Sequence, residues 1–493
     1  MANRQKSRAP RVPHVSQNQL ILEGFESPFE RSLNPNNRWV KLAKLLPWDD
    51  LISVYRKHFP QKGTGRPDLN PRVVLGAIII KHMCNLDDRE TVDLISENIY
   101  MQYFLGYSSF SDVPPFDASL FVEFRKRFGL EQINAFNERI LKIKLDAEKK
   151  KNQNNQDDDE DDKRNKGSLI VDATVCPQDI AFPTDLNLLN DARMKSEELL
   201  DFVFTYSTLS IKPRNYRKKA RKDYLKTAQK KRKTKNEIRA ALRKQLNYLN
   251  RNIQSINYLL DHCQSIPFDK HQYKYWFVIQ HLYEQQKYMF DQKSHKVEHR
   301  IVSIHQPHNR PMVRGKANAN VEFGAKINVA IVDGFSFLDD MSWDAYNEGT
   351  RLQDCVEKYK NRYGYYPENV LVDKIYCTRD NRAFLKAKDI NLKAKPLGRP
   401  SSKALSNQVS PGERNPIEGK FGQAKKAYGM DNIRARLAQT SESWIASIIL
   451  VLNLVHLTEV ALCWLKIRIF KNTLKIFVRK MNAKYQFLME NIG

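Results

Sequence analysis

The stretch SLIVDATV at residues 168–175 decides the fold. It is a short apolar run rich in β-branched residues, lying between a polar segment and Pro177, and it predicts a strand. Later segments have a similar texture: 301–305, 322–332, 335–339, 369–373 and 390–395. Helical patterns at 348–363 and 379–387 separate the later ones. The sequence therefore predicts a mixed α/β domain over 168–440, interrupted by a helical insertion at roughly 196–299.

The segment before this strand, residues 149–167, reads KKKNQNNQDDDEDDKRNKG and holds six consecutive acids. Blocks of like charge are normally solvated, so we interpret it as a linker at a domain boundary and not as a metal site. Residues 1–26 carry positive charge without an apolar core, which indicates a disordered basic tail and not a signal peptide.

Residues 27–148 are predicted to be helical. Asn70 and Pro71 supply an N-cap and a first-turn proline, and Asp87 with Glu90 predicts a capping box opening a second helix. A third helix is expected from Asp117 through Phe128. Two helices joined by a short turn could read DNA as a helix-turn-helix, or could be a plain helical hairpin.

The bulk composition points to a polyanionic partner. The 493 residues contain 82 Lys plus Arg against 56 Asp plus Glu, a formal net charge of +26. Nucleic acid is the first candidate for such a charge, and an anionic membrane surface is the weaker one. The six cysteines are scattered without a C-x-x-C pair, so we expect no zinc ribbon or disulfide framework, and a reducing cytosol.

The apolar run at 444–465 approaches the length of a membrane span. Asn453, His456 and Glu459 would each be costly in hydrocarbon. We therefore expect a buried core helix within a C-terminal helical segment, 441–493, and no membrane.

The insertion is strongly basic. Residues 211–250 hold 16 Lys plus Arg against two acids, interleaved with three tyrosines. This composition favours a helical arm that follows a DNA backbone, and the alternative is a solvated arm. The candidate phosphate-binding residues are Lys218, Lys219, Arg221 and Lys222.

Two predicted strands end alike, because LIVDAT places Asp172 after three aliphatic residues and VLVDKIY does the same for Asp373. Aspartate is disfavoured in strands, and ligands gather at the carboxyl ends of strands in open α/β sheets. We expect the two side chains to meet there. Three acids that lie after another predicted strand could replace Asp373: Asp339, Asp340 and Asp344.

The segment RNPIEGKFGQAKKAYG, 414–429, places Glu418 between Arg414 and Lys425 at helical spacings of four and seven. With Asp172 and Asp373, Glu418 would complete an all-oxygen site suited to Mg²⁺ or Mn²⁺, while the two cations hold phosphate oxygens. The alternatives are a surface ion-pair ladder, or a capping box with Asn415 as N-cap and Glu418 at the third helical position.

The order of these acids resembles the DDE transposases of bacterial insertion sequences, and within them it is most similar to the insertion-sequence-five group and its relatives. The resemblance lies in VDATVCPQDIAFPTDLNLLNDAR, RPMVRGKANANVEFGAKI, VDKIYCTRDNR and RNPIEGKFGQAKKAYGM. It implies an RNase H-like core with Asp172, Asp373 and Glu418 as catalytic metal ligands, beside Arg414 and Lys425. Pro411 and Ile375 stand where the family pattern often has Tyr and Gly.

The resemblance implies a transposase that binds terminal inverted repeats through its N-terminal helical domain and catalyses strand cleavage and strand transfer. Two Mg²⁺ or Mn²⁺ ions would serve phosphodiester displacement. Because two element ends must meet, we expect a homodimer, located in the bacterial cytoplasm with the nucleoid. Two alternatives stay open: an RNase H-like endonuclease without strand transfer, and an inactive DNA-binding descendant of a transposase.

Overall fold

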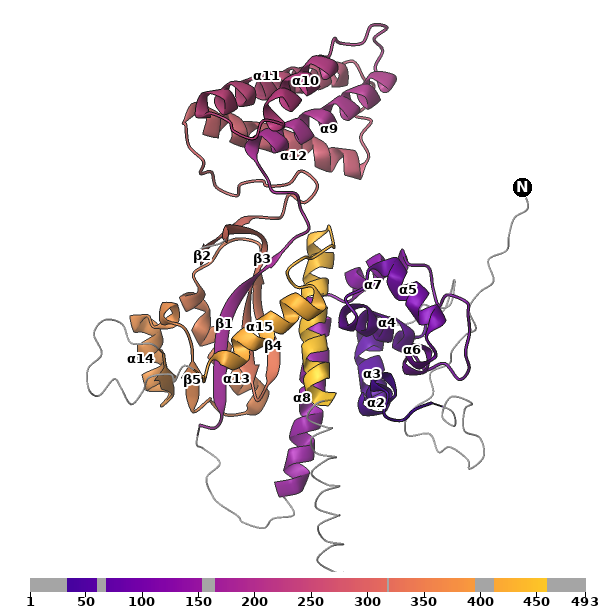
Figure 1. Ribbon diagram of the computed structural model, residues 1–493, viewed down its shortest axis with the longest axis vertical. Coiled ribbons are helices and arrows are strands. Elements are labelled where there is room, and N and C mark those ends of the chain that lie inside the picture. Colours follow the sequence, from indigo (N-terminus) through magenta and orange to yellow (C-terminus); the bar gives the residue numbers. More distant parts are fainter. Residues whose placement is uncertain (1–32, 60–67, 153–164, 317–318, 395–411, 459–493) are drawn as a thin grey trace, which may run out of the picture.

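The computed structural model describes residues 33–59, 68–152, 165–316, 319–394 and 412–458. Figure 1 shows three parts: a group of short helices near the N-terminus, a curled sheet with helices against it, and a separate helical bundle above the sheet. The mixed α/β fold class predicted from the sequence is confirmed.

The N-terminal part is all helical, with α2 (Arg38–Leu45), α3 (Trp48–His58), α4 (Pro71–Met83), α5 (Asp88–Glu97), α6 (Ile99–Phe104), α7 (Leu120–Arg127) and α8 (Leu130–Asn152). Asn70 caps α4, and Asp87 forms the predicted capping box with Glu90 at the start of α5. The helix expected from Asp117 begins three residues later, because Asp117 accepts the Ser119 amide in the preceding turn. Helix α8 continues into the predicted linker, where KKKN consists mostly of good helix formers.

The sheet contains β1 (Ser168–Pro177), β2 (Pro311–Lys316), β3 (Ala319–Val332), β4 (Phe335–Ser342), β5 (Asn369–Leu371) and β6 (Asn391–Lys393). Its order is β2-β3-β1-β5-β6, with β4 also on β3. β1 is antiparallel to β3 and parallel to β5, and β5 is parallel to β6.

Helical elements connect and cover these strands. They are η1 (Glu348–Arg351) and α13 (Leu352–Tyr363) between β4 and β5, η2 (Lys374–Tyr376) and α14 (Arg379–Ala387) between β5 and β6, and α15 (Asn415–Tyr428) packed against β1. The 348–363 and 379–387 helices are therefore where the sequence predicted them.

The predicted strand at 301–305 is wrong. This segment has no regular secondary structure, and its apolar side chains Ile301 and Ile304 are buried in the core of the helical bundle. The run is apolar because it seals that core, and a sequence pattern alone does not distinguish this from a buried strand.

One continuous hydrophobic core joins the N-terminal helices, the sheet and the helix Ala438–Thr458. That helix is long and apolar enough to cross a membrane, but 83% of its most apolar window is buried inside the protein, as expected for a core helix. Its Asn453 is satisfied there, because it accepts the Ser336 amide at 2.7 Å and donates to the Ser336 carbonyl at 2.7 Å. Trp444 receives the buried Lys81 ammonium 4.5 Å from its ring centroid, which links α4 to this helix.

The insertion between β1 and β2 is a four-helix bundle with a core of its own. Its helices are α9 (Asp185–Tyr206), α10 (Arg217–Ala228), α11 (Lys235–Leu260) and α12 (Lys270–Asp291). The boundary expected at residue 196 falls inside α9, whose Leu188 and Leu189 already belong to the bundle core. The apolar side chains of α9 before residue 196 thus serve the insertion and not the sheet.

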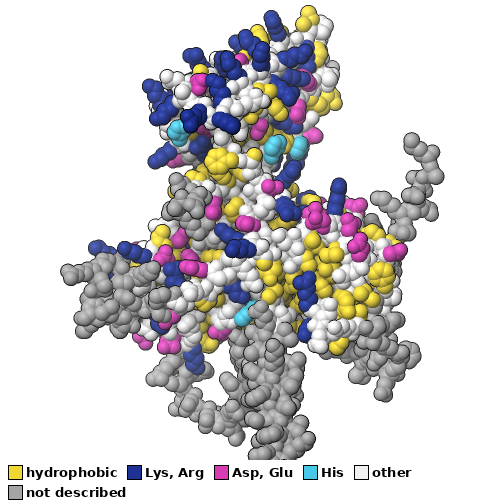
Figure 2. Space-filling view, viewed as in Figure 1, with side chains coloured by type: hydrophobic (Ala, Val, Ile, Leu, Met, Phe, Trp, Pro, Cys, Tyr) yellow, Lys and Arg dark blue, Asp and Glu magenta, His cyan; other side chains and the backbone are white. Residues whose placement is uncertain are grey.

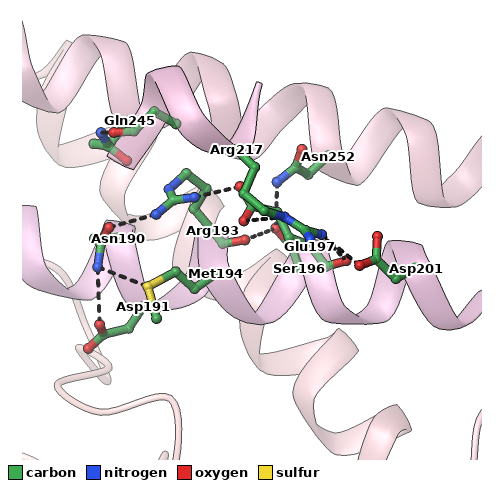
Figure 3. A network of polar contacts seen from close by, with 11 residues as sticks. Asn190, Asp191, Arg193, Met194, Ser196, Glu197, Asp201, Arg217, Gln245 and Asn252 are labelled. Carbon is green, nitrogen blue, oxygen red and sulfur yellow. Dashed lines mark hydrogen bonds and ion pairs between the residues drawn. The ribbon is translucent and has the colours of Figure 1, made fainter. Parts of the chain in front are cut away.

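A buried polar network holds α9, α10 and α11 together (Figure 3). Arg193, 1% exposed, pairs with Glu197 one turn later and donates to Asn190 at 2.8 Å. Arg217 of α10 reaches Glu197 at 3.2 Å, and Asn252 of α11 donates to Ser196 at 2.9 Å. Because buried charges are costly unless paired, these contacts fix how the three helices dock.

Candidate active site

Asp172 and Asp373 lie on neighbouring parallel strands at the same level. In the β1–β5 pairing, Ile170 is opposite Leu371, an offset of 201 residues (371 − 170). Asp172 and Asp373 have this same offset (373 − 172 = 201), so they follow the last paired residues in register. A common register places both side chains on one face of the sheet. The sequence therefore placed the two acids correctly relative to each other.

The two aspartates differ in their local setting. Asp373 follows the end of β5, where its carboxylate accepts the Lys374 amide at 2.8 Å and caps η2. The sequence suggested that Asp172 ends its strand, but β1 continues to Pro177 by pairing with β3. Asp172 is consequently the less exposed, with 20% of its side chain accessible against 51% for Asp373.

The Arg414 guanidinium lies between the two carboxylates. One nitrogen is 3.2 Å from an Asp172 oxygen, and the other is 3.3 Å from an Asp373 oxygen. Its side chain is 16% exposed. Two neighbouring carboxylates repel each other unless a cation separates them, and here the chain supplies that cation.

Burial raises the pKa of Asp172 to about 6. The Arg414 charge and the Ala173 amide lower this pKa, while the charges of Glu348 and Asp373 raise it. Burial is the largest of these effects, because it disfavours the charged carboxylate, and the Arg414 guanidinium only partly offsets it.

Glu418 lies in the first turn of α15 and is exposed. The capping-box alternative is wrong, because Asn415 is the first helical residue and Arg414 occupies the N-cap without a side-chain cap bond. Glu418 is one turn beyond Arg414, and its side chain makes no hydrogen bond or ion pair to any other residue that the structure describes. Lys425 is in the last turn, half-buried, and Ile417 packs the helix into the core.

The structure thus brings Asp172, Asp373 and Arg414 into contact, but not Glu418. No three His, Cys, Asp or Glu side chains within the described ranges are close enough together to hold a metal ion. The aspartate pair nevertheless fits a divalent cation, since its donors are oxygens and it already binds one positive group.

The alternative aspartates have other partners. Asp339 is buried and pairs with Arg362 at 2.6 Å, and Asp340 pairs with Arg351 at 2.9 Å. Asp344 lies on the exposed side, 3.5 Å from Arg310. Neither Asp339 nor Asp340 is available to the site of Asp172.

Sequence reasoning missed Glu348, the acid whose charge acts on Asp172. It opens the predicted helix 348–363, and its carboxylate pairs with Lys326 of β3 at 2.8 Å. The signal in the sequence was the position of Glu348 at the start of the helical segment that follows β4. We interpreted this residue only as part of the helical pattern.

Comparisons with known proteins identify the family of the chain. A family model described as "Transposase domain (DUF772)" matches residues 27–127, and one described as "Transposase DDE domain" matches residues 370–455. The chain is 30% identical over 179 residues to "Uncharacterized protein ORF8 in nfe locus" of Rhizobium meliloti, covering 36% of this chain and 78% of that protein. No solved structure matches significantly. The chain belongs to the DDE transposases of insertion sequences.

The bundle of this transposase carries a dense layer of Lys and Arg (Figure 2). Lys218, Arg221, Lys222 and Lys226 recur at helical spacing on α10. Together with Leu225 and Gln229 they line a concavity of about 430 Å³ along that helix. Among the described residues, no carboxylate lies within ion-pair distance of these four cations. Lys219, which the sequence grouped with them, is not part of this lining, and its charge acts on Asp223.

Several other cations of the bundle are paired internally. Lys212 and Arg217 share Asp201, Lys244 pairs with Asp223, and Lys230 pairs with Glu237. The interleaved tyrosines also serve the bundle, since Tyr248 donates to Asp223 at 2.9 Å. The α10 face is therefore one surface on which the transposase presents positive charge outward.

The N-terminal helices offer less positive charge. The exposed residues of α5 are Arg89, Glu90, Asp93 and Glu97, three acids and one base. Arg125 of α7 is engaged by both oxygens of Asp88, at 2.7 and 2.8 Å. An acidic α5 is poorly suited to lie in a DNA groove, which weakens the helix-turn-helix alternative.

Proposed function

We propose that this transposase binds the terminal inverted repeats of its insertion sequence and catalyses metal-dependent strand cleavage and strand transfer. The observation that carries the proposal is the pair Asp172 and Asp373, in register on adjacent parallel strands and joined through one cation. Two strands that are far apart in sequence bring their aspartates together here, as a shared phosphoryl-transfer site requires.

We infer an RNase H-like core for residues 168–440. Support comes from the order of elements, in which the antiparallel β1, β3 and β4 are followed by α13 and then by the parallel strands β5 and β6 around α14. The bundle is inserted between β1 and β3 along the chain, and the short strand β2 lies between the bundle and β3.

Asp172 and Asp373 would hold the divalent metal, with Glu418 as the third ligand. Oxygen donors favour Mg²⁺ or Mn²⁺, and a pair of such ions would activate the attacking hydroxyl or water and stabilise the leaving oxygen. Support for Glu418 comes from its helix, since Arg414 contacts both aspartates and stands one turn before Glu418. Arg414 and Lys425 would bind phosphate oxygens of the DNA.

The outward face of α10 would bind the DNA backbone. None of its four cations pairs with an acid in the part of the chain that the structure describes, so a phosphate can bind each one without breaking such an ion pair. Transposition joins two element ends, and a homodimer in the bacterial cytoplasm would supply one active site for each.

The test compares Asp172→Asn, Asp373→Asn and Glu418→Gln with the control Asp354→Asn, an exposed acid on α13. With terminal-repeat DNA and Mg²⁺, the three site variants should bind but neither cut nor join, while the control does both. Normal cutting by Asp172→Asn would refute the proposed active site. Normal cutting by Glu418→Gln alone would remove Glu418 from it. Cutting without joining by the wild-type protein would identify an endonuclease.

A further inference from the structure

Glu348 is held in a defined place between β4 and α13. It is the first residue of η1, its side chain is 20% exposed, and one of its oxygens is 2.8 Å from the Lys326 ammonium. Lys326 also donates to the Tyr346 carbonyl at 3.0 Å. The carboxylate therefore cannot turn freely into solvent without losing its partner.

Element η1 packs directly on the turn that follows Asp373. Asn381, buried, donates from one amide nitrogen to the carbonyls of Gly349 at 2.7 Å and Tyr376 at 2.8 Å. A Cβ atom added at Gly349 would come within 2.8 Å of the Ile375 carbonyl oxygen. The backbone beside Glu348 and the turn after Asp373 thus touch, and only glycine permits this approach.

A buried hydrogen-bond chain ties the same turn to the strand pair beneath it. The Tyr376 hydroxyl donates to the Asn328 side chain at 3.0 Å, and Asn328 donates to the Cys355 sulfur at 2.9 Å. Asn328 of β3 is the strand partner of Ala173, the neighbour of Asp172. One framework therefore fixes the backbones at Asp172, Asp373 and Glu348 relative to one another.

The electrostatics agree with this placement. Burial raises the pKa of the Tyr376 hydroxyl, and the charges of Glu348 and Asp172 raise it further. Burial and the Glu348 charge likewise raise the pKa of Asp172. The Glu348 charge therefore acts on both groups, in keeping with the packing of η1 on the turn after Asp373.

We propose that Glu348 is a further acidic residue of this active site, a positioning residue that strengthens divalent-cation binding at Asp172 and Asp373 without ligating the cation. Lys326 holds the carboxylate by one oxygen, and the contact of Gly349 with Ile375 sets its distance from Asp373. The proposal rests on the proposed function, because it assumes that the aspartate pair binds a divalent cation.

A purely structural ion pair between Glu348 and Lys326 makes a different prediction. If the pair only fixed η1, removing either partner would loosen the site and weaken cation binding in the same direction. If the negative charge matters, Glu348→Gln weakens binding because it removes attraction and leaves the Lys326 charge uncompensated. Lys326→Gln then leaves binding equal or tighter, because it removes repulsion.

The experiment titrates the full-length transposase, without DNA, with Mn²⁺ and follows free Mn²⁺ by electron paramagnetic resonance. We expect Glu348→Gln to weaken binding about tenfold, equivalent to about 1.4 kcal/mol. Lys326→Gln should not weaken it, and Asp354→Asn on the exposed side of α13 should match wild type. Glu348→Asp keeps the charge and should stay near wild type, which covers the case in which Glu348→Gln does not fold.

The outcomes separate this inference from the proposed function. Wild-type affinity in Glu348→Gln, with binding lost in Asp172→Asn, would overturn the role of Glu348 and leave the metal site standing. Equal weakening by Glu348→Gln and Lys326→Gln would overturn it in favour of a structural pair. A wild-type protein that binds no Mn²⁺, or an Asp172→Asn variant that binds it normally, would overturn both.

Discussion

Neutralising the outward face of α10 should flatten the salt dependence of DNA binding. The perturbation changes Lys218, Arg221, Lys222 and Lys226 together to Gln. From the first to the last of these residues, α10 rises about 12 Å, at about 1.5 Å per residue. Duplex DNA carries one phosphate per about 1.7 Å of axis, so about seven phosphates lie within that length. Each of the four cations can therefore contact a phosphate of its own.

Each phosphate contact contributes about 0.9 to the slope of log affinity against log salt, so four lost contacts lower the slope by up to about 3.6. Between about 50 and 200 mM salt, the wild-type affinity should then fall about 150-fold more than that of the variant. Fluorescence anisotropy of a labelled terminal-repeat duplex over this range measures both slopes.

The matched control changes four exposed cations elsewhere on the bundle to Gln: Lys270, Lys287, Lys293 and Lys296. These lie on or just after α12, so the control has the same net charge change away from the α10 concavity. An equal loss of slope in both variants would show that only net charge matters. An unchanged slope in the α10 variant would refute the backbone-binding role and leave a solvated arm.

Three further predictions concern the stability of the metal-free transposase. Arg414→Gln should lower the free energy of unfolding by about 1–2 kcal/mol at neutral pH, because two carboxylates lose their counter-ion. In thermal unfolding, adding Asp172→Asn should cancel most of this loss, and additive effects of the two changes would contradict the prediction. Burial, with nearby positive charge, lowers the pKa of His308 from 6.5 to about 4. The unfolded chain therefore binds a proton at a higher pH than the folded protein does. The free energy of unfolding should be highest above pH 6.5 and should fall by at most about 3 kcal/mol as the pH drops to 4. His308→Gln should remove that dependence in pH-resolved urea titrations. Arg193→Met should cost about 3–5 kcal/mol by leaving Glu197 buried without its main partner, and an additional Glu197→Leu should recover part of it in urea unfolding.

Local signals were read correctly from the sequence because their causes are local. The Asn70 cap and the Asp87 capping box depend on residues within one turn, and the structure contains both. The alternative capping box with Asn415 as N-cap is not formed, and its cause is also local. Pro416 needs no amide partner in the first turn, and the helix begins one residue earlier with Arg414 turned toward the aspartates.

The aspartate pair was accessible to sequence reasoning because its cause is a repeated pattern. Three aliphatic residues precede each of Asp172 and Asp373, and equal buried lengths of two neighbouring parallel strands put the acids in register. Glu348 was not accessible in this way. Its place depends on the close approach of Gly349 to Ile375 and on the double hydrogen bond from Asn381, contacts that no spacing in the sequence encodes.

The arrangement also explains why the third proposed ligand is the one that stands apart. Asp172 and Asp373 are held by the sheet strands, whereas Glu418 belongs to α15, which packs against β1 and follows the N-cap residue Arg414 that contacts both aspartates. A divalent cation bound by the aspartates would compete with the guanidinium for the same oxygens. Release of Arg414 would then act at the N-terminal end of α15, one turn from Glu418. The residue that neutralises the pair in the metal-free protein would therefore also link the position of the proposed third ligand to the charge of the site.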